Sequence, residues 1–375
     1  MDISSLVPFL ASASIVNTKP NWGPHVESLA GQLAQIQELH SFGDDMQFKL
    51  GSWSRSSFVS LAKWLIERSA AVGADQALAG LSRYVSCSEV PIEQHMLFTN
   101  ITTPTTVQLP WGISMAPLVT QPHSYQRDLV LRSFMAVPHL LQSSVSLTKT
   151  RSFPYKFRPA GSQLPRVEAD WEQLADVGLL LSLIGPSAPV CMGSFALMPD
   201  WVPDMGGQGA ASYYGVELPS VPIPHNEDWG SVSPLMEAWA KRTPAQREHL
   251  RVPLRRINYA LRRWSDVDRA IDLGVALEAA FLNDREPERG ELSFTIRLRA
   301  ARFMGLDRES RQRIAKKTGF LYRLRSIAVH SGTIKNELDG QNTHEALKEG
   351  VTFAATVLAK QIMSGPPDWA DVVFG

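Results

Sequence analysis

The sequence predicts an α+β N-terminal domain at about residues 1–235, followed by an all-α helical domain at 241–364 and a short tail at 365–375. The 375 residues exceed what one compact core normally holds. Short β-branched and aromatic runs, broken by proline and glycine, fill the stretch from about 85 to 225, whereas helical spacing dominates after about residue 250. Four prolines within Leu218–Pro234 predict a non-helical connector between the two domains.

Two helices and several strands are expected in the N-terminal domain. Val26–His40 and Phe58–Val72 carry apolar residues at helical spacing. Phe98–Leu109 and Val190–Leu197 are β-branched and aromatic runs that favour strands. The order of the strands does not follow from the sequence, because Asn-Gly and Asp-Gly hairpin turns are scarce and no internal repeat is present.

The C-terminal domain is expected to consist of consecutive amphipathic helices with recognisable caps. Ser265 precedes a helix whose first turn carries Asp266 and Asp268, near the positive end of the helix dipole. Asp307 has the same capping position before a short segment, and Gly332 is placed to end a helix. The expected helices run from after Pro253 to about Trp264, from Asp266 through Phe281, from about Glu291 to Met304, from Asp307 to about Lys317, from about Thr318 to Gly332, and from Thr343 to Ser364.

The composition is that of an ordinary protein of the cytoplasm. Hydrophobic residues make up 44% and charged residues 20% of the chain, and the two cysteines, Cys87 and Cys191, do not form a disulfide framework. The N-terminus has no basic region before its apolar residues, so it does not resemble a signal peptide. The longest apolar run, Val177–Ile184, is far shorter than the roughly 20 residues of a membrane span, so no membrane partner is expected.

The charges are unevenly distributed along a chain whose formal net charge is zero. Residues 1–240 hold 13 Lys and Arg against 20 Asp and Glu, residues 241–335 hold 22 against 11, and residues 336–375 hold 2 against 6. The middle segment is therefore +11 and the N-terminal part −7. An arginine-rich segment suits phosphate backbones, which predicts RNA as a partner. Two alternatives are that the arginines only solvate the outer faces of helices, and that the acidic part docks on the basic part and shields it.

Leu321–Gly332 is the stretch around which the functional prediction is organised. Its apolar residues follow one helical stripe, which leaves Arg325 and His330 outside the core and exposed to a partner or substrate. At about 100° per residue the two side chains lie about 140° apart, so they flank the stripe and do not share a face. Arg323 and Ser326 lie on the side of His330.

An arginine and a histidine at this spacing can support RNA phosphodiester cleavage. Arginine is always cationic and can bind two phosphate oxygens, and histidine can move a proton near neutral pH. The alternative is that Arg325 is a solvated helix residue and that His330 interacts favourably with the helix dipole.

Three segments together resemble the HEPN superfamily, in particular its Apea-like branch. They are Asp272-Leu-Gly-Val-Ala-Leu-Glu278, the helix through Ile296-Arg-Leu-Arg-Ala-Ala301, and Leu321-Tyr-Arg-Leu-Arg-Ser-Ile-Ala-Val-His-Ser-Gly332. The resemblance covers about residues 250–364. It implies an all-α HEPN-type helical bundle, usually dimeric, in which an R-x4–6-H motif forms a metal-independent RNase site.

Residue by residue, the resemblance assigns Arg325 and His330 to the R-x4–6-H motif and Glu278 to the acidic position of the family's Leu-Glu helix. Ser326 is a departure, because many HEPN nucleases have Asn, Asp or His directly after the arginine. Serine can still donate and accept a hydrogen bond. We therefore expect Arg325 and His330 to be catalytic, with Glu278, Ser326 and Arg323 in supporting positions.

The functional hypothesis is a cytoplasmic, homodimeric endoribonuclease that takes part in bacterial anti-phage defence or acts as a toxin. Proteins with this resemblance are often abortive-infection components, which implies a phage-derived trigger or a regulatory partner. The N-terminal domain is expected to serve in recognition or to restrain the nuclease. One alternative is a non-catalytic HEPN module that binds nucleic acid, nucleotide or a protein partner. Another is an enzyme whose site lies in the N-terminal domain.

No cofactor or metal is expected. Gly206-Gly-Gln-Gly209 lacks the lysine of a P-loop, and the histidines and Cys87 lack the spacing of metal ligands. Asp266, Asp268 and Asp272 could be mistaken for a metal cluster, and helix capping with solvation is the better explanation for them.

Overall fold

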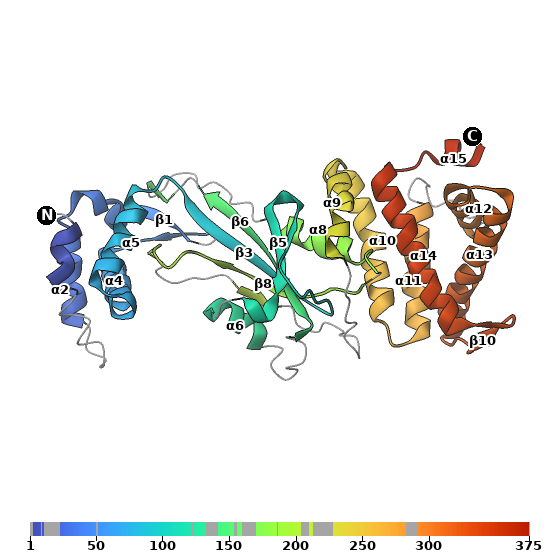
Figure 1. The fold of residues 1–375 in the computed structure, drawn as a ribbon, viewed down its shortest axis with the longest axis horizontal. Coiled ribbons are helices and arrows are strands. Elements are labelled where there is room, and N and C mark those ends of the chain that lie inside the picture. Colours follow the sequence, from blue (N-terminus) through green and yellow to red (C-terminus); the bar gives the residue numbers. More distant parts are fainter. Residues whose placement is uncertain are drawn as a thin grey trace.

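The protein has an elongated shape, with helices at both ends and an antiparallel sheet between them (Figure 1). It is represented by a computed structural model. The structure describes residues 3–8, 10, 23–49, 52–121, 124–132, 142–153, 156–159, 170–185, 187–203, 210–212, 228–282 and 292–374.

Helices and a small sheet form the N-terminal end around their own hydrophobic core. Helix α4 spans Phe58–Val72 as predicted, because Ser57 accepts a hydrogen bond from the backbone N–H of Ser60 and so caps its first turn. The prediction of one helix over Val26–His40 is wrong. Helix α2 ends at Leu33, because Ile36 adopts an extended conformation that buries its side chain. The elements are η1 Ile3–Leu6, α2 Gly23–Leu33, η2 Gln37–Leu39, α3 Ser41–Asp44, β1 Asp45–Lys49, β2 Ser52–Arg55, α4 Phe58–Val72, α5 Ala74–Ser86 and β7 Phe157–Pro159.

The central sheet has six antiparallel strands in the order β4-β5-β6-β3-β8-β9. The predicted strand at Val190–Leu197 is confirmed as β8. The prediction of one run over Phe98–Leu109 is wrong, because Asn100, with φ of 66°, turns the chain out of the sheet directly after β3. The elements here are β3 Val90–Thr99, β4 Val107–Leu109, η3 Pro110–Gly112, β5 Ile113–Pro117, η4 Leu118–Thr120, α6 Tyr125–Arg132, β6 Ser144–Phe153, α8 Trp171–Leu181, β8 Val190–Leu197 and β9 Ala210–Ser212.

Helix α8 connects the sheet with the C-terminal helices, and one hydrophobic core runs through all three. Gly178 lets α8 approach strand β3 closely, since a Cβ atom at this position would lie 2.4 Å from the Phe98 ring. Residues 218–227 of the predicted proline-rich connector lie outside the described residues. From Asp228 onward the chain is packed, and the buried Trp229 donates from Nε1 to the carbonyl oxygen of Thr102 at 2.8 Å.

The described residues of the C-terminal part form helices, as predicted, together with a two-stranded hairpin. Caps at Ser265, Asp307 and Asn342 and the left-handed Gly332 set the helix ends. The last predicted helix, Thr343–Ser364, is confirmed as α14. The elements are η5 Trp229–Val232, α9 Ser233–Ala240, α10 Pro244–Arg262, α11 Asp266–Phe281, α12 Leu292–Met304, α13 Arg308–Ser331, β10 Glu337–Leu338, β11 Gln341–Asn342, α14 Thr343–Ser364 and α15 Trp369–Phe374.

Two predicted helix boundaries in this part are wrong. Helix α10 begins at Pro244, after a capping box of Thr243 and Gln246, and Pro253 lies inside it. A proline inside a helix costs about 3 kcal/mol, and burial of the Pro253 ring and of its neighbours offsets this cost. Helix α13 is continuous, because Thr318 is buried and Gly319 packs against the aliphatic part of Arg297.

A buried ion pair joins α8 to α10. Arg251 donates from Nε to Asp176 Oδ1 at 2.7 Å and from Nη2 to Asp176 Oδ2 at 2.8 Å. Asp176 also accepts from Trp239 Nε1 at 3.0 Å, which brings α9 to the same carboxylate. Glu172 and Glu248 complete the set around Arg251, and these carboxylates raise the pKa of its guanidinium.

We expect Asp176→Ala to destabilise the protein by about 3–5 kcal/mol, because Arg251 would remain buried without its two-pronged partner. Asp200→Ala is the matched control. Its carboxylate pairs with Arg68 on the surface and is 79% exposed, so the expected loss is below about 1 kcal/mol. Chemical denaturation followed by circular dichroism measures both, and equal losses for the two variants would contradict the assignment.

Candidate functional site

The candidate site lies where α11 and α13 pack against each other. Arg325 Nη2 on α13 lies 3.2 Å from Glu278 Oε1 and 3.5 Å from Glu278 Oε2 on α11. The Arg325 guanidinium also lies 5.7 Å from the centre of the Tyr322 ring, one turn earlier on its own helix. Arg325 and Glu278, which are 47 positions apart and were both expected from the sequence to belong to the site, are therefore in contact.

Arg325 lies outside the apolar stripe of its helix, yet it is only partly open to a partner. Its side chain is only 27% exposed, and its Nε atom is buried with no hydrogen-bond acceptor among the described residues. The reason is Gly274 on α11, where an added Cβ atom would lie 2.2 Å from Arg325 Cγ and 2.7 Å from Arg325 Cβ. The base of the arginine side chain thus occupies the space that the glycine leaves, and its tip reaches Glu278.

Tyr322, which was not among the residues expected from the sequence, belongs to the same cluster. Burial raises the pKa of the Tyr322 phenol, and the charge of Glu278 and a hydrogen bond to it raise the pKa further, while Arg325 opposes them. The phenol therefore remains protonated and can donate to Glu278. The three-residue spacing of Tyr322 and Arg325 on one helix was a usable signal, because residues at that spacing are neighbours on a helix surface.

His330 lies apart from this cluster, in the last turn of α13. Its side chain is exposed, and the helix ends two residues later at Gly332, whose φ is 66°. On one continuous helix, five residues separate Arg325 and His330 by about 140° of rotation and roughly 7.5 Å of rise. The geometry does not aim both side chains of one chain at a single phosphate.

The β10–β11 hairpin contacts α13 through Arg323. Its turn is formed by Asp339 and Gly340, both with positive φ, an Asp-Gly turn of the kind that favours hairpins. Asp339 accepts from Arg323 Nη2 at 2.5 Å, so Arg323 has a carboxylate partner that the sequence did not reveal. Ser326 is half-buried. Of the supporting residues, Glu278 contacts Arg325, whereas Arg323 contacts the hairpin.

The expectation that the Asp272 carboxylate is solvated is wrong. It is almost fully buried on α11 and accepts hydrogen bonds from Arg256 Nη1 and Arg263 Nε, each at 2.8 Å. Asp266 and Asp268 do lie in the first turn of α11, whose backbone Ser265 caps. Within the described ranges, no group of three or more His, Cys, Asp and Glu side chains is placed to hold a metal ion.

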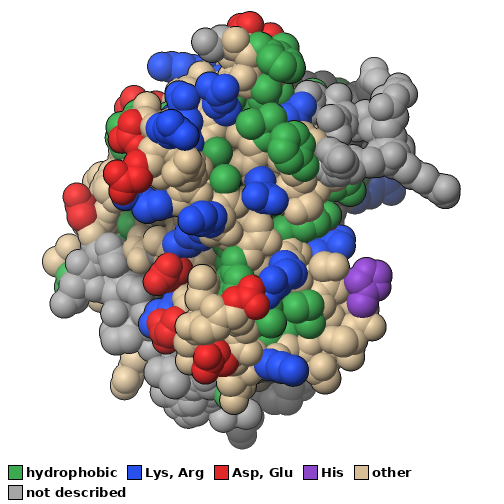
Figure 2. Space-filling model, turned by 90° about the vertical axis from the view of Figure 1, so that its right-hand side faces the viewer, with side chains coloured by type: hydrophobic (Ala, Val, Ile, Leu, Met, Phe, Trp, Pro, Cys, Tyr) green, Lys and Arg blue, Asp and Glu red, His purple; other side chains and the backbone are tan. Residues whose placement is uncertain are grey.

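Basic side chains are spread over the end of the molecule formed by α12 and α13 (Figure 2). Hydrophobic side chains also reach the surface at this end (Figure 2). Phe294 on α12 is 56% exposed, and Leu306, between α12 and α13, is 90% exposed. We call this surface the α12–α13 face. Its exposed basic residues are Arg297, Arg302, Arg308, Arg313, Lys316 and Arg323.

Comparisons with protein-family models, with curated proteins and with solved structures found no match for this chain. None of the helices in the described part of the chain combines the length and the apolar character needed to cross a membrane.

We expect Gly274→Ala to destabilise the protein by about 1–3 kcal/mol, because the new methyl group overlaps the base of Arg325 and must separate α11 from α13. Gly31→Ala in α2 is the matched control. A Cβ atom there has nothing within 4 Å, so the change is expected to be neutral or to stabilise by up to about 1 kcal/mol. Thermal unfolding distinguishes them, and a neutral Gly274→Ala would show that the helices repack without cost.

Proposed function

We propose that this protein is an endoribonuclease of HEPN type in which Arg325 and His330 carry the reaction. The observation that supports the proposal most directly is the contact between Arg325 and Glu278. The resemblance selected both residues from sequence alone, and they meet on facing helices. The exposed histidine on the same helix supplies a group that can transfer protons near neutral pH.

In the proposed reaction, the ribose 2′-hydroxyl attacks its own phosphodiester and the 5′-oxygen leaves. His330 removes the proton from the 2′-hydroxyl or delivers one to the leaving oxygen. Arg325 binds the phosphate oxygens, whose negative charge increases in the transition state. Glu278 and Tyr322 position its guanidinium, since Glu278 holds one side of the fork and the Tyr322 ring lies beside it.

The same geometry argues for a homodimer. Arg325 and His330 point in different directions on one α13 helix, so a second copy related by a twofold axis is needed to bring an arginine and a histidine to one phosphate. Basic residues on the α12–α13 face provide phosphate contacts for RNA beyond the scissile bond. In cells, we propose a role in bacterial anti-phage defence or as a toxin, which rests on the sequence resemblance alone.

A second function is favoured by one observation. The Arg325 guanidinium is already paired with Glu278, and its Nε atom is buried, so the pair also fits a purely structural contact between α11 and α13. A HEPN module that binds a nucleic acid, a nucleotide or a protein without cleaving RNA would have this arrangement. Intact RNA after incubation with the folded protein would support this second function.

We expect the purified full-length protein to cleave total RNA or tRNA and to leave 2′,3′-cyclic phosphate ends. His330→Ala should lower the rate by about 10²–10⁴-fold, the usual contribution of general acid–base catalysis. Arg325→Lys should also be strongly impaired, because lysine keeps the charge and loses the planar two-pronged geometry. Denaturing gels measure the rates, and circular dichroism establishes that each variant is folded.

His25→Ala is the control variant for this experiment, because His25 lies in α2 at the opposite end of the molecule and is exposed. It should cleave at the parental rate. EDTA should not abolish cleavage, since the resemblance implies a metal-independent reaction. A folded His330→Ala variant that cleaves at the parental rate would refute the assignment of His330.

We expect the protein to be a dimer at micromolar concentration, because the reaction requires residues from two α13 helices. Light scattering after size-exclusion chromatography measures the mass, to be compared with the 41.5 kDa of one chain. Mixing His330→Ala with Arg325→Lys should restore part of the activity if each composite site takes its arginine from one copy and its histidine from the other. A monomer that cleaves RNA at full rate would eliminate this arrangement.

A further inference from the structure

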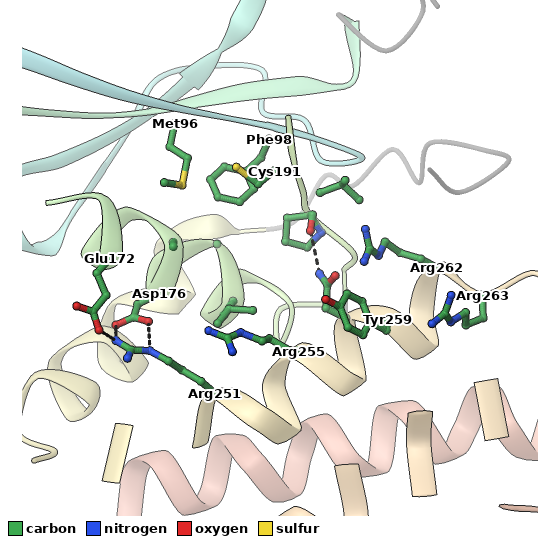
Figure 3. A pocket seen from close by; sticks show the side chains of 16 residues that line it. Met96, Phe98, Glu172, Asp176, Cys191, Arg251, Arg255, Tyr259, Arg262 and Arg263 are labelled. Carbon is green, nitrogen blue, oxygen red and sulfur yellow. Dashed lines mark hydrogen bonds and ion pairs between the residues drawn. The ribbon is translucent and has the colours of Figure 1, made fainter. Parts of the chain in front are cut away.

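A cavity of about 780 Å³ lies between α10 and the central sheet (Figure 3). None of its lining residues belongs to the Arg325 cluster, which lies between α11 and α13. Strands β3 and β8 and helix α8 form one side of it, and α10 forms the other. Its size falls within the range of roughly 300–1,000 Å³ that is typical of small-molecule sites. No residue of this cavity takes part in the proposed RNA cleavage.

The side of the cavity formed by the sheet and α8 is mostly apolar, and its two charged residues, Glu172 and Asp176 of α8, lie at one end beside Arg251. Burial raises the pKa of the Cys191 thiol to about 12, so this side chain is neutral at physiological pH. Asn258 is fixed in place, since its Nδ2 donates to Ser182 Oγ at 3.0 Å and to the carbonyl oxygen of Pro189 at 2.9 Å. The apolar lining residues are Met96, Phe98, Ala175, Leu179, Pro189, Val190 and Cys191.

The α10 side of the cavity is basic. At one end Arg251 is neutralised by Asp176 and Glu172, the two acidic residues of the lining. Arg255, Arg262 and Arg263 line the rest of the wall, as Figure 3 shows. The cavity therefore has an excess of positive charge at a distance from its two carboxylates.

The spacing of these residues explains why they line one cavity. Arg255, Tyr259 and Arg262 lie at positions i, i+4 and i+7 of α10, which share one face of the helix, and Arg263 follows directly as the extended C-cap residue. The Tyr259 ring has the Arg262 guanidinium 4.8 Å from its centre. Arg255 is exposed and has no ion-pair partner among the described residues, whereas Arg263 is paired with Asp272. Arg255 is thus available to an incoming anion.

We propose that this cavity is a binding site for a nucleoside polyphosphate, with the base and sugar against the apolar side and the phosphates at Arg255 and Arg262. Arg255 and Arg262 lie two helical turns apart on one wall of the cavity, and the planar guanidinium of arginine matches the geometry of phosphate oxygens. The flat heterocyclic base can pack against the apolar side of the cavity, where it is shielded from water. This site is separate from the proposed cleavage site, so the proposal does not depend on whether the protein cleaves RNA.

Isothermal titration of the full-length protein with ATP, with tripolyphosphate and with adenosine tests the proposal. ATP should bind at least about tenfold more tightly than tripolyphosphate or adenosine, because only ATP occupies both halves of the cavity. Arg255→Gln and Arg262→Gln should each weaken ATP binding by about tenfold or more, as expected for the loss of a charge-assisted hydrogen bond. Circular dichroism establishes that the variants are folded.

Arg55→Gln is the matched control, because Arg55 is an exposed arginine on β2, at the N-terminal end of the molecule. It should leave ATP affinity within about twofold of the parent. The proposal is overturned if ATP does not bind the folded parent, or if tripolyphosphate binds as tightly as ATP. It is also overturned if Arg55→Gln weakens ATP binding as much as Arg255→Gln does, since the effect would then be general electrostatic attraction.

Discussion

The buried pair of Arg251 and Asp176 is the interaction on which the arrangement of the two halves depends. Asp176 lies on the helix that packs on the sheet, Arg251 lies on the first long helix of the C-terminal part, and Trp239 brings α9 to the same carboxylate. A buried charge pair requires well-aligned partners, because desolvation otherwise outweighs the attraction. The two-pronged geometry therefore fixes α8 relative to α10, and with them the walls of the cavity.

The same requirement for a charged partner applies to other arginines of the basic segment, residues 241–335. Part of the charge of this segment is paired with carboxylates from other helices: Asp176 binds Arg251, Asp272 binds Arg256 and Arg263, and Glu278 binds Arg325. Helix α11 supplies two of these carboxylates, six residues apart. It contacts α10 on one side through Asp272 and α13 on the other through Glu278. One helix thus joins the wall of the cavity to the arginine of the candidate site.

Local signals in the sequence predicted much of the C-terminal part and little of the sheet. Caps such as Ser265 and Asp307 and the left-handed Gly332 depend on neighbouring residues only, so they could be located from sequence. The strand order depends on pairings such as Val90 with Phe153, which no local pattern specifies. The continuity of α13 through Gly319 was missed for a similar reason, since a residue of another helix covers the glycine.

The candidate site shows the same division between local and distant information. The five-residue spacing of Arg325 and His330 predicted their divergent directions, because helix geometry alone determines it. What the spacing could not predict is the depth of Arg325, which depends on Gly274 of another helix. In the proposed reaction, that depth distinguishes the roles of the two residues. A guanidinium anchored by Glu278 has a fixed orientation and suits phosphate binding, whereas His330 in a terminal turn can adjust its angle to transfer a proton. In the proposed dimer, one copy would contribute the fixed cation and the other the adjustable base that act on one phosphodiester.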